Sequence, residues 1–175
     1  MRIAVQLALI LALVPVSAAA QHPGHQHAGG APPDGHRRAQ ACLDEFDAVV
    51  QEGRGFGMAF AADQHGYPGP LHVLELKERL GLTAEQEARV RGLMEAMFAE
   101  SRPKSARLLA AESALRALFA AGGADEAAVR AAVAEVERAR ADVRVVHLLA
   151  HLKTREVLTE AQRRIYHQAR WSAAR

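Results

Sequence analysis

The 175-residue sequence predicts an all-α protein built on one long antiparallel helical hairpin with short flanking helices. Its composition favours helices over sheets, because only 5% of residues are aromatic while alanine, leucine, glutamate and arginine are abundant. Apolar residues recur at helical spacing over two long stretches. A five-residue pattern occurs twice, as Leu82-Thr83-x-x-Gln86 and as Leu158-Thr159-x-x-Gln162. The two copies mark the two ends of the predicted hairpin.

Each copy of this pattern predicts the sharp start of a helix. Thr83 has the residue type of a helix N-cap, and Gln86 stands at the third helical position. A glutamine there can reach back to the amide of the cap residue, which makes a capping box. Thr159 and Gln162 have the same relationship, so a second helix restarts directly after Leu158.

Two long helices are predicted between these copies. The first runs from Ala84 to about Ala120, the pair Gly122-Gly123 makes a turn, and the second begins near Asp125. The residues expected on the two apolar stripes are Val90, Met94, Met97, Leu108, Leu115 and Phe119 on the first helix, and Val129, Val133, Val136, Val143, His147, Ala150 and Val157 on the second.

A hairpin of two such helices buries little by itself, so it needs partners. Each helix is about 50 Å long at 1.5 Å per residue. We expect the hairpin to pack against a helix from Leu71 to its glycine stop at Gly81 and against a terminal helix, Glu160 to Trp171. A second copy of the chain is the remaining expected partner, which makes a homodimer.

The N-terminus predicts export to the periplasm. Arg2 precedes a short apolar run, Ile3 to Val16, and the small residues Ser17 to Ala20 follow as a cleavage region, so residues 1–20 are predicted to be a cleaved signal peptide. The run is shorter than the roughly 20 residues that a membrane helix needs. We expect the mature protein to be periplasmic.

Residues 21–37 form a glycine- and proline-rich tether that carries His22, His25, His27 and His36. Such a tract either collects transition-metal ions weakly or acts only as a solvated linker. Residues 38–69 are expected to hold a short helix, ending near Gln51, and a glycine-rich loop. In that loop Met58 and His65 are either ligands or anchors. The fourth segment, residues 70–175, is the helical-hairpin domain.

Several function classes are excluded by composition and motifs. The 22 basic and 20 acidic residues are interspersed, which leaves no concentrated basic face for nucleic acid. Cys42 is the single cysteine, so no internal disulfide forms. The sequence carries no recognisable catalytic triad, phosphate loop or haem-attachment motif. We therefore expect neither an enzyme nor an organic cofactor.

The second long helix places His147 and His151 one turn apart on one face, at a spacing that lets both bind one ion. Reflection through the turn puts Met94, Glu95 and Met97 opposite them, and the helix at Leu71 offers His72. Thioethers with imidazoles suit copper, particularly Cu(I), whereas Glu95 with imidazoles suits Zn, Ni or Co. The alternative is that the histidines edge the apolar stripe and the methionines fill the core.

The signal peptide, the histidine-rich tether, the helical hairpin and the paired Leu-Thr-x-x-Gln motifs together resemble the LTxxQ superfamily of small periplasmic proteins. The similarity covers about residues 70–166, and Gly69-Pro70-Leu71-His72 is similar to the metal-resistance branch. This superfamily includes the Spy and CpxP stress chaperones and heavy-metal-resistance sensors of the CnrX and ZraP type. The resemblance implies a cradle-like dimer and, by approximate register, a metal site at His72, Glu95 and His147.

Two functions follow as expectations. In the first, a non-enzymatic periplasmic protein binds or senses Zn, Cu, Ni or Co ions and changes the surface that it shows to a partner. In the second, an ATP-independent chaperone of the Spy and CpxP type holds unfolded clients on apolar and methionine side chains. The expected partners are a second copy, unfolded clients, and a membrane sensor or anti-sigma protein.

Overall fold

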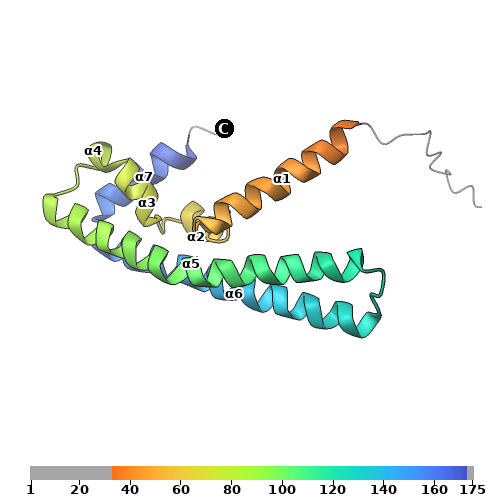
Figure 1. Ribbon diagram of the computed structural model, residues 1–175. Helices are drawn as coiled ribbons and strands as arrows, with labels where there is room; N and C mark the ends of the chain where they lie inside the picture. Colours follow the sequence, from red (N-terminus) through yellow and green to blue (C-terminus); the bar gives the residue numbers. More distant parts are fainter. Residues whose placement is uncertain (1–32, 173–175) are drawn as a thin grey trace, which may run out of the picture.

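The computed structural model describes residues 33–172, and this range is helical with no β-strand. The predicted signal peptide and the tether residues His22, His25 and His27 lie outside the described residues. No helix within residues 33–172 is long and apolar enough to cross a membrane. The helices are α1 Pro33–Gln51, α2 Phe60–Gln64, α3 Pro70–Glu75, α4 Lys77–Leu80, α5 Ala84–Ala120, α6 Glu126–Val157 and α7 Glu160–Trp171 (Figure 1).

The predicted all-α fold and its long hairpin are confirmed. The antiparallel helices α5 and α6 lie side by side and are joined by a turn at Gly122, whose φ is +71° (Figure 1). Asp125 caps α6, because its carboxylate accepts a hydrogen bond from the amide of Ala128 at 2.8 Å. The two motif threonines, Thr83 and Thr159, start α5 and α7 with complete capping boxes.

The two motif glutamines also join the ends of the hairpin to each other. The Gln86 amide nitrogen donates to Gln162 Oε1 at 2.9 Å, and the Gln162 amide nitrogen donates back to Gln86 Oε1 at 2.9 Å. Gln86 further donates to the Val157 carbonyl and Gln162 to the Gly81 carbonyl. We call this pair the glutamine lock. It satisfies the polar atoms of both side chains while fixing the open end of the hairpin.

Other helices pack on the end of the hairpin that carries the glutamine lock, whereas none of the described helices packs on the turn end. Helices α3, α4 and α7 gather over the first end, and α1 rises away from the middle of the hairpin (Figure 1). The cluster beneath α3, α4 and α7 consists of Val73, Leu80, Val90, Val157, Leu158 and Tyr166. A second cluster, where the end of α1 meets the hairpin, consists of Val50, Met58, Leu108, Val136, Ala139 and Val143.

Three local expectations differ from the structure. Helix α1 begins at Pro33 rather than near Arg38, because Pro at the first turn and Asp34 behind it suit a helix start; the tether residue His36 is therefore helical and exposed. The single helix expected from Leu71 to Leu80 breaks at Leu76 into α3 and α4.

The third difference concerns the ends of the apolar stripes. Phe119 is 58% exposed and Val133 is 43% exposed, although both were expected in the interface between the two long helices. None of the helices within residues 33–172 covers the turn end, so side chains at the edge of this two-helix contact stay in solvent. The stripes are thus buried only where a third element covers them.

Candidate metal site beneath the strap

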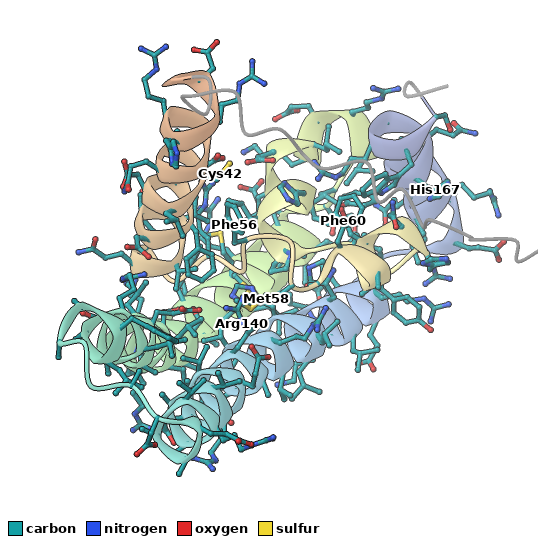
Figure 2. All side chains as sticks on the ribbon, turned by 90° about the vertical axis from the view of Figure 1, so that its right-hand side faces the viewer. Cys42, Phe56, Met58, Phe60, Arg140 and His167 are labelled. Atoms are coloured by element: carbon teal, nitrogen blue, oxygen red, sulfur yellow. The ribbon has the colours of Figure 1, made fainter. Side chains whose placement is uncertain are left out.

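Residues 53–69, which we call the strap, connect α1 to α3 and cross the hairpin over His147 and His151. Figure 2 shows the strap residues Phe56, Met58 and Phe60 in the middle of the molecule, between α1 and the remaining covering helices. A cleft of about 340 Å³ lies here. The side chains that line it and can bind an ion belong to Met58, Asp63, His72, Met97, His147 and His151.

His147 is buried with one ring nitrogen unbonded. The residue is 5% exposed, and its Nε2 has no hydrogen-bond partner among the described residues. The Gly53 backbone acts on the ring, and we assign this contact to the other ring nitrogen, Nδ1, because Nε2 has no partner. Burial first, and the charge of a protonated His151 next, lower the pKa of His147 to about 4 against the opposing effect of Gly53. At neutral pH His147 is thus an uncharged imidazole with its lone pair on Nε2.

His151 is held in the same way one turn further along α6. Its Nδ1 lies 2.7 Å from the Tyr67 carbonyl, and since a carbonyl only accepts, Nδ1 carries the proton and donates. Burial lowers the pKa of His151, while the Tyr67 carbonyl and the Asp63 carboxylate raise it. The lone pair of His151 is therefore also on Nε2. A carbonyl at Nδ1 that fixes the tautomer and the ring orientation is the usual support of a metal-ligating histidine.

Two glycines let the strap lie directly on these imidazoles. A β-carbon added at Gly55 would lie 2.9 Å from His147 Cγ, and one at Gly69 would lie 2.7 Å from His151 Nε2. Neither position tolerates a side chain without displacing a ring. Between them, Phe56 adopts a φ of +37°, the only non-glycine residue in the described range with a positive φ. The strap is thus shaped to the two histidines.

The buried carboxylate of Asp63 joins α2, which lies within the strap, to α7. Tyr166 donates a hydrogen bond from its hydroxyl to Asp63 Oδ1 at 2.5 Å, and Arg170 Nε donates to Asp63 Oδ2 at 3.2 Å. Burial, followed by the hydrogen bond to Asp63, raises the pKa of Tyr166 above its usual range. Asp63 is 5% exposed, and both oxygens of this carboxylate, which is the one acidic side chain among the described residues that line the cleft, are already bonded.

The structure brings some of the sequence-predicted residues together and separates others. His147, His151, His72 and Met97 all line the cleft. Met94 and Glu95 do not line it, and Glu95 is exposed. His72 stands on the cleft wall with its Nδ1 bonded to Glu75 at 2.8 Å. Within residues 33–172, no three His, Cys, Asp or Glu side chains come close enough together to hold an ion.

Sequence reasoning left open the role of Met58, named Gly69 only within the resemblance, and did not identify Gly55 or Asp63. Met58 is buried and lines the cleft, while His65, the other candidate in the loop, is exposed and bonds the Ala61 carbonyl. Glycine content marks residues 53–69 as a loop, but it does not tell a solvated loop from one that packs on a helix. The contact between a glycine and a ring is visible only in three dimensions.

The sequence of residues 55–164 matches the family described as heavy-metal resistance. That span is more than half of the 175 residues and contains most of the strap, both motif copies and both buried histidines. The chain belongs to the heavy-metal resistance family. This family is part of the LTxxQ superfamily, so the resemblance of the sequence to that superfamily is confirmed. Comparison with curated proteins and with solved structures gives no significant match.

Family membership supports a role related to metal resistance, and the donor atoms of the cleft fit an ion in part. Two neutral imidazoles with their Nδ1 atoms anchored supply two nitrogen donors, and the unbonded, buried Nε2 of His147 is an atom that a bound ion would satisfy. The rest of a coordination shell has to come from other lining groups or from water. An ion held there would tie the strap and the hairpin together without doing chemistry on a substrate.

Proposed function

We propose that this chain is a non-enzymatic periplasmic metal-resistance protein that binds a transition-metal ion through Nε2 of His147 and Nε2 of His151. The observation that carries the proposal is the orientation of the two rings. His151 turns Nδ1 toward the Tyr67 carbonyl of the strap, and the buried Nε2 of His147 has no hydrogen-bond partner in the described residues. A buried imidazole used only for packing would be expected to have both ring nitrogens satisfied.

Both residues sit on the rigid helix α6 and are covered by the strap, which makes the strap the element that senses the ion. Its backbone contacts the imidazoles at Gly55, Tyr67 and Gly69, so an ion bound at Nε2 acts on the strap directly. An ion that binds only the folded state stabilises it by an amount that grows with the logarithm of ion concentration once that concentration exceeds Kd. We therefore expect a bound ion to hold the strap more firmly against α6, without a large rearrangement of the hairpin.

The experiment is a titration of the exported chain with Zn(II), Co(II) and Cu ions, followed by calorimetry and thermal unfolding. His147→Ala combined with His151→Ala should lower the affinity of the tightest site by at least about 100-fold, since both nitrogen donors are lost. His65→Ala combined with His167→Ala is the matched control, because these two histidines are exposed and lie outside the cleft. Equal affinities for the wild type and the cleft variant would refute the proposal.

A chaperone function is the second candidate, and one surface feature favours it. Val145, Leu149 and Leu152 are 51%, 47% and 46% exposed and lie at i, i+4 and i+7 on the outer face of α6. Such a row is a weak binding surface for unfolded clients. A homodimer and a membrane sensor or anti-sigma partner stay predictions from the sequence.

The two candidates respond to different substitutions. Replacing all three of Val145, Leu149 and Leu152 by serine should abolish suppression of aggregation of a chemically denatured client and leave metal affinity unchanged. Leu43→Ser is the control, since Leu43 is 46% exposed but lies on α1. A wild-type chain that has no effect on client aggregation would exclude the chaperone function.

A further inference from the structure

The donor atoms of the cleft are soft or neutral once existing hydrogen bonds are counted. Its single carboxylate, Asp63, is occupied at both oxygens by Tyr166 and Arg170. The remaining donor atoms are imidazole nitrogens and two thioether sulfurs, of Met58 and Met97. Carboxylate oxygens suit harder divalent ions, whereas thioethers select Cu(I). The chemistry of the lining therefore distinguishes among the ions that a histidine pair alone would accept.

The two sulfur-bearing side chains flank His147 along α6. Met97 packs in one buried cluster with Val146 and Ala150, the residues just before His147 and one turn after it. Met58 packs in a cluster that contains Val143, one turn before His147. Met97 and Met58 are 7% and 8% exposed, so neither side chain is free in solvent. Both line the same cleft as His147 and His151.

The charge of the side chains that line the cleft also favours a monovalent ion. Among the described residues that line the cleft, no anionic side chain is free to offset the charge of an ion, because Asp63 is bonded to Arg170 and Tyr166. Apolar side chains, including Val49, Leu71 and Phe98, make up much of the wall. Transfer of an ion into an apolar site costs more for a double charge than for a single one, since the cost grows with the square of the charge. A monovalent ion with neutral ligands is the ion that this cleft holds at least cost.

We propose that the cleft is a cuprous-ion site, in which Met97 and Met58 add thioether sulfur to Nε2 of His147 and Nε2 of His151. This inference rests on the proposed function and assigns to it the metal and two further ligands. The family match names heavy-metal resistance without naming an ion. Met94 is excluded from the site, although it precedes Met97 by one turn of the same helix, because it does not line the cleft.

The test is an anaerobic titration of the full exported chain with Cu(I) against a chromogenic Cu(I) chelator, in parallel with a Zn(II) titration. Met97→Leu should weaken Cu(I) binding at least tenfold and leave Zn(II) affinity within about twofold, because leucine replaces only the soft donor. Met58→Leu should weaken Cu(I) binding in the same direction. Met94→Leu is the matched control and should bind both ions like the wild type.

A second measurement needs no substitution. In chain labelled with selenomethionine and loaded with Cu(I), X-ray absorption at the copper edge should show selenium in the first shell. Absence of selenium there, or a Met97→Leu affinity for Cu(I) equal to that of Met94→Leu, would overturn the copper assignment. If His147→Ala with His151→Ala still weakens Zn(II) or Co(II) binding in that case, the proposed function stands and only the choice of ion fails. If that double variant binds every ion like the wild type, both proposals fail.

Discussion

The glutamine lock and the cleft are two polar regions that pack against the long hairpin, but the hydrogen bonding of their polar atoms differs. In the lock, Gln86 and Gln162 exchange two hydrogen bonds and use the remaining capacity on backbone groups. In the cleft, the buried Nε2 of His147 has no partner among the described residues. Satisfied polar networks fix a structure, whereas an unsatisfied buried atom costs stability and suggests a binding role. We therefore assign a structural role to the lock and propose a binding role for the cleft.

Of the substitutions that compare the two regions, Gln162→Leu in the lock is expected to lower the free energy of unfolding most. This change removes the reciprocal amide pair and the support of the Thr159 cap, and Gln86 loses one of the two hydrogen bonds at each of its side-chain polar atoms. We expect the free energy of unfolding to fall by about 3 kcal/mol, as for other broken buried networks. Urea denaturation measures this change in the free energy of unfolding. Gln168→Leu on the exposed face of α7 is the control and should change stability by less than about 0.5 kcal/mol.

The contrasting substitution in the cleft is His147→Leu. It removes an unpaired buried nitrogen, so the free energy of unfolding of the metal-free chain should stay level or rise while metal binding is lost. A loss as large as that of Gln162→Leu would mean that His147 is a structural residue, and the distinction between the two regions would fail.

The second effect is a pH dependence that only the cleft has, because amides do not titrate. The pKa of His147 is about 4 when folded, below its ordinary value of 6.5, so between these values the unfolded chain binds more protons. The free energy of unfolding of the metal-free chain should therefore fall as pH drops from 6.5 to 4. The His147 contribution is on the order of 3 kcal/mol at 1.36 kcal/mol per unit.

The difference between wild type and His147→Leu, measured by urea denaturation with a chelator present, isolates this contribution from that of the carboxylates. Above pH 7 the difference should be constant, and it should shift against the wild type by the stated amount near pH 4. A difference that does not change with pH would show that His147 is as solvated when folded as when unfolded.

The smallest effect concerns the fit of the strap. Gly69→Ala places a methyl group 2.7 Å from His151 Nε2, so the imidazole has to turn away from the cleft. We expect metal affinity to fall about tenfold, equivalent to about 1.4 kcal/mol, with little change in the lock. Gly92→Ala is the matched control, since a β-carbon there meets nothing within 4 Å. Isothermal titration of both variants compares them directly, and equal affinities would mean that the strap does not position His151.

The fold was predictable from the sequence because its main elements are encoded locally. Thr83 and Gln86 specify one helix start, Thr159 and Gln162 another, and Gly122 with Asp125 the turn between the long helices. What could not be predicted depends on which surfaces are covered. Phe119 follows the apolar pattern and is nevertheless exposed, because no helix of the described range packs over the turn end of the hairpin.

The candidate site was predictable only in part for the same reason. Helical spacing puts His147 and His151 on one face, and reflection through the turn brings Met97 to the same cleft. The approximate register did not tell Met97 from Met94 and Glu95, which lie outside the cleft. The strap contacts at Gly55, Tyr67 and Gly69 join residues about 80 to 90 positions apart along the chain, as in the 84-residue separation of Tyr67 and His151, and no local pattern encodes them.

The central claim is that both cleft histidines carry the ring proton on Nδ1 and leave Nε2 free to bind an ion, and imidazole NMR tests this claim most directly. Long-range ¹H–¹⁵N correlation spectra of the metal-free chain near pH 7.5 report which ring nitrogen carries the proton. We predict the Nδ1–H tautomer for both His147 and His151, and a selective shift of their Nε2 resonances when an ion is added. An Nε2–H tautomer at both residues, with no response to any ion, would contradict the account.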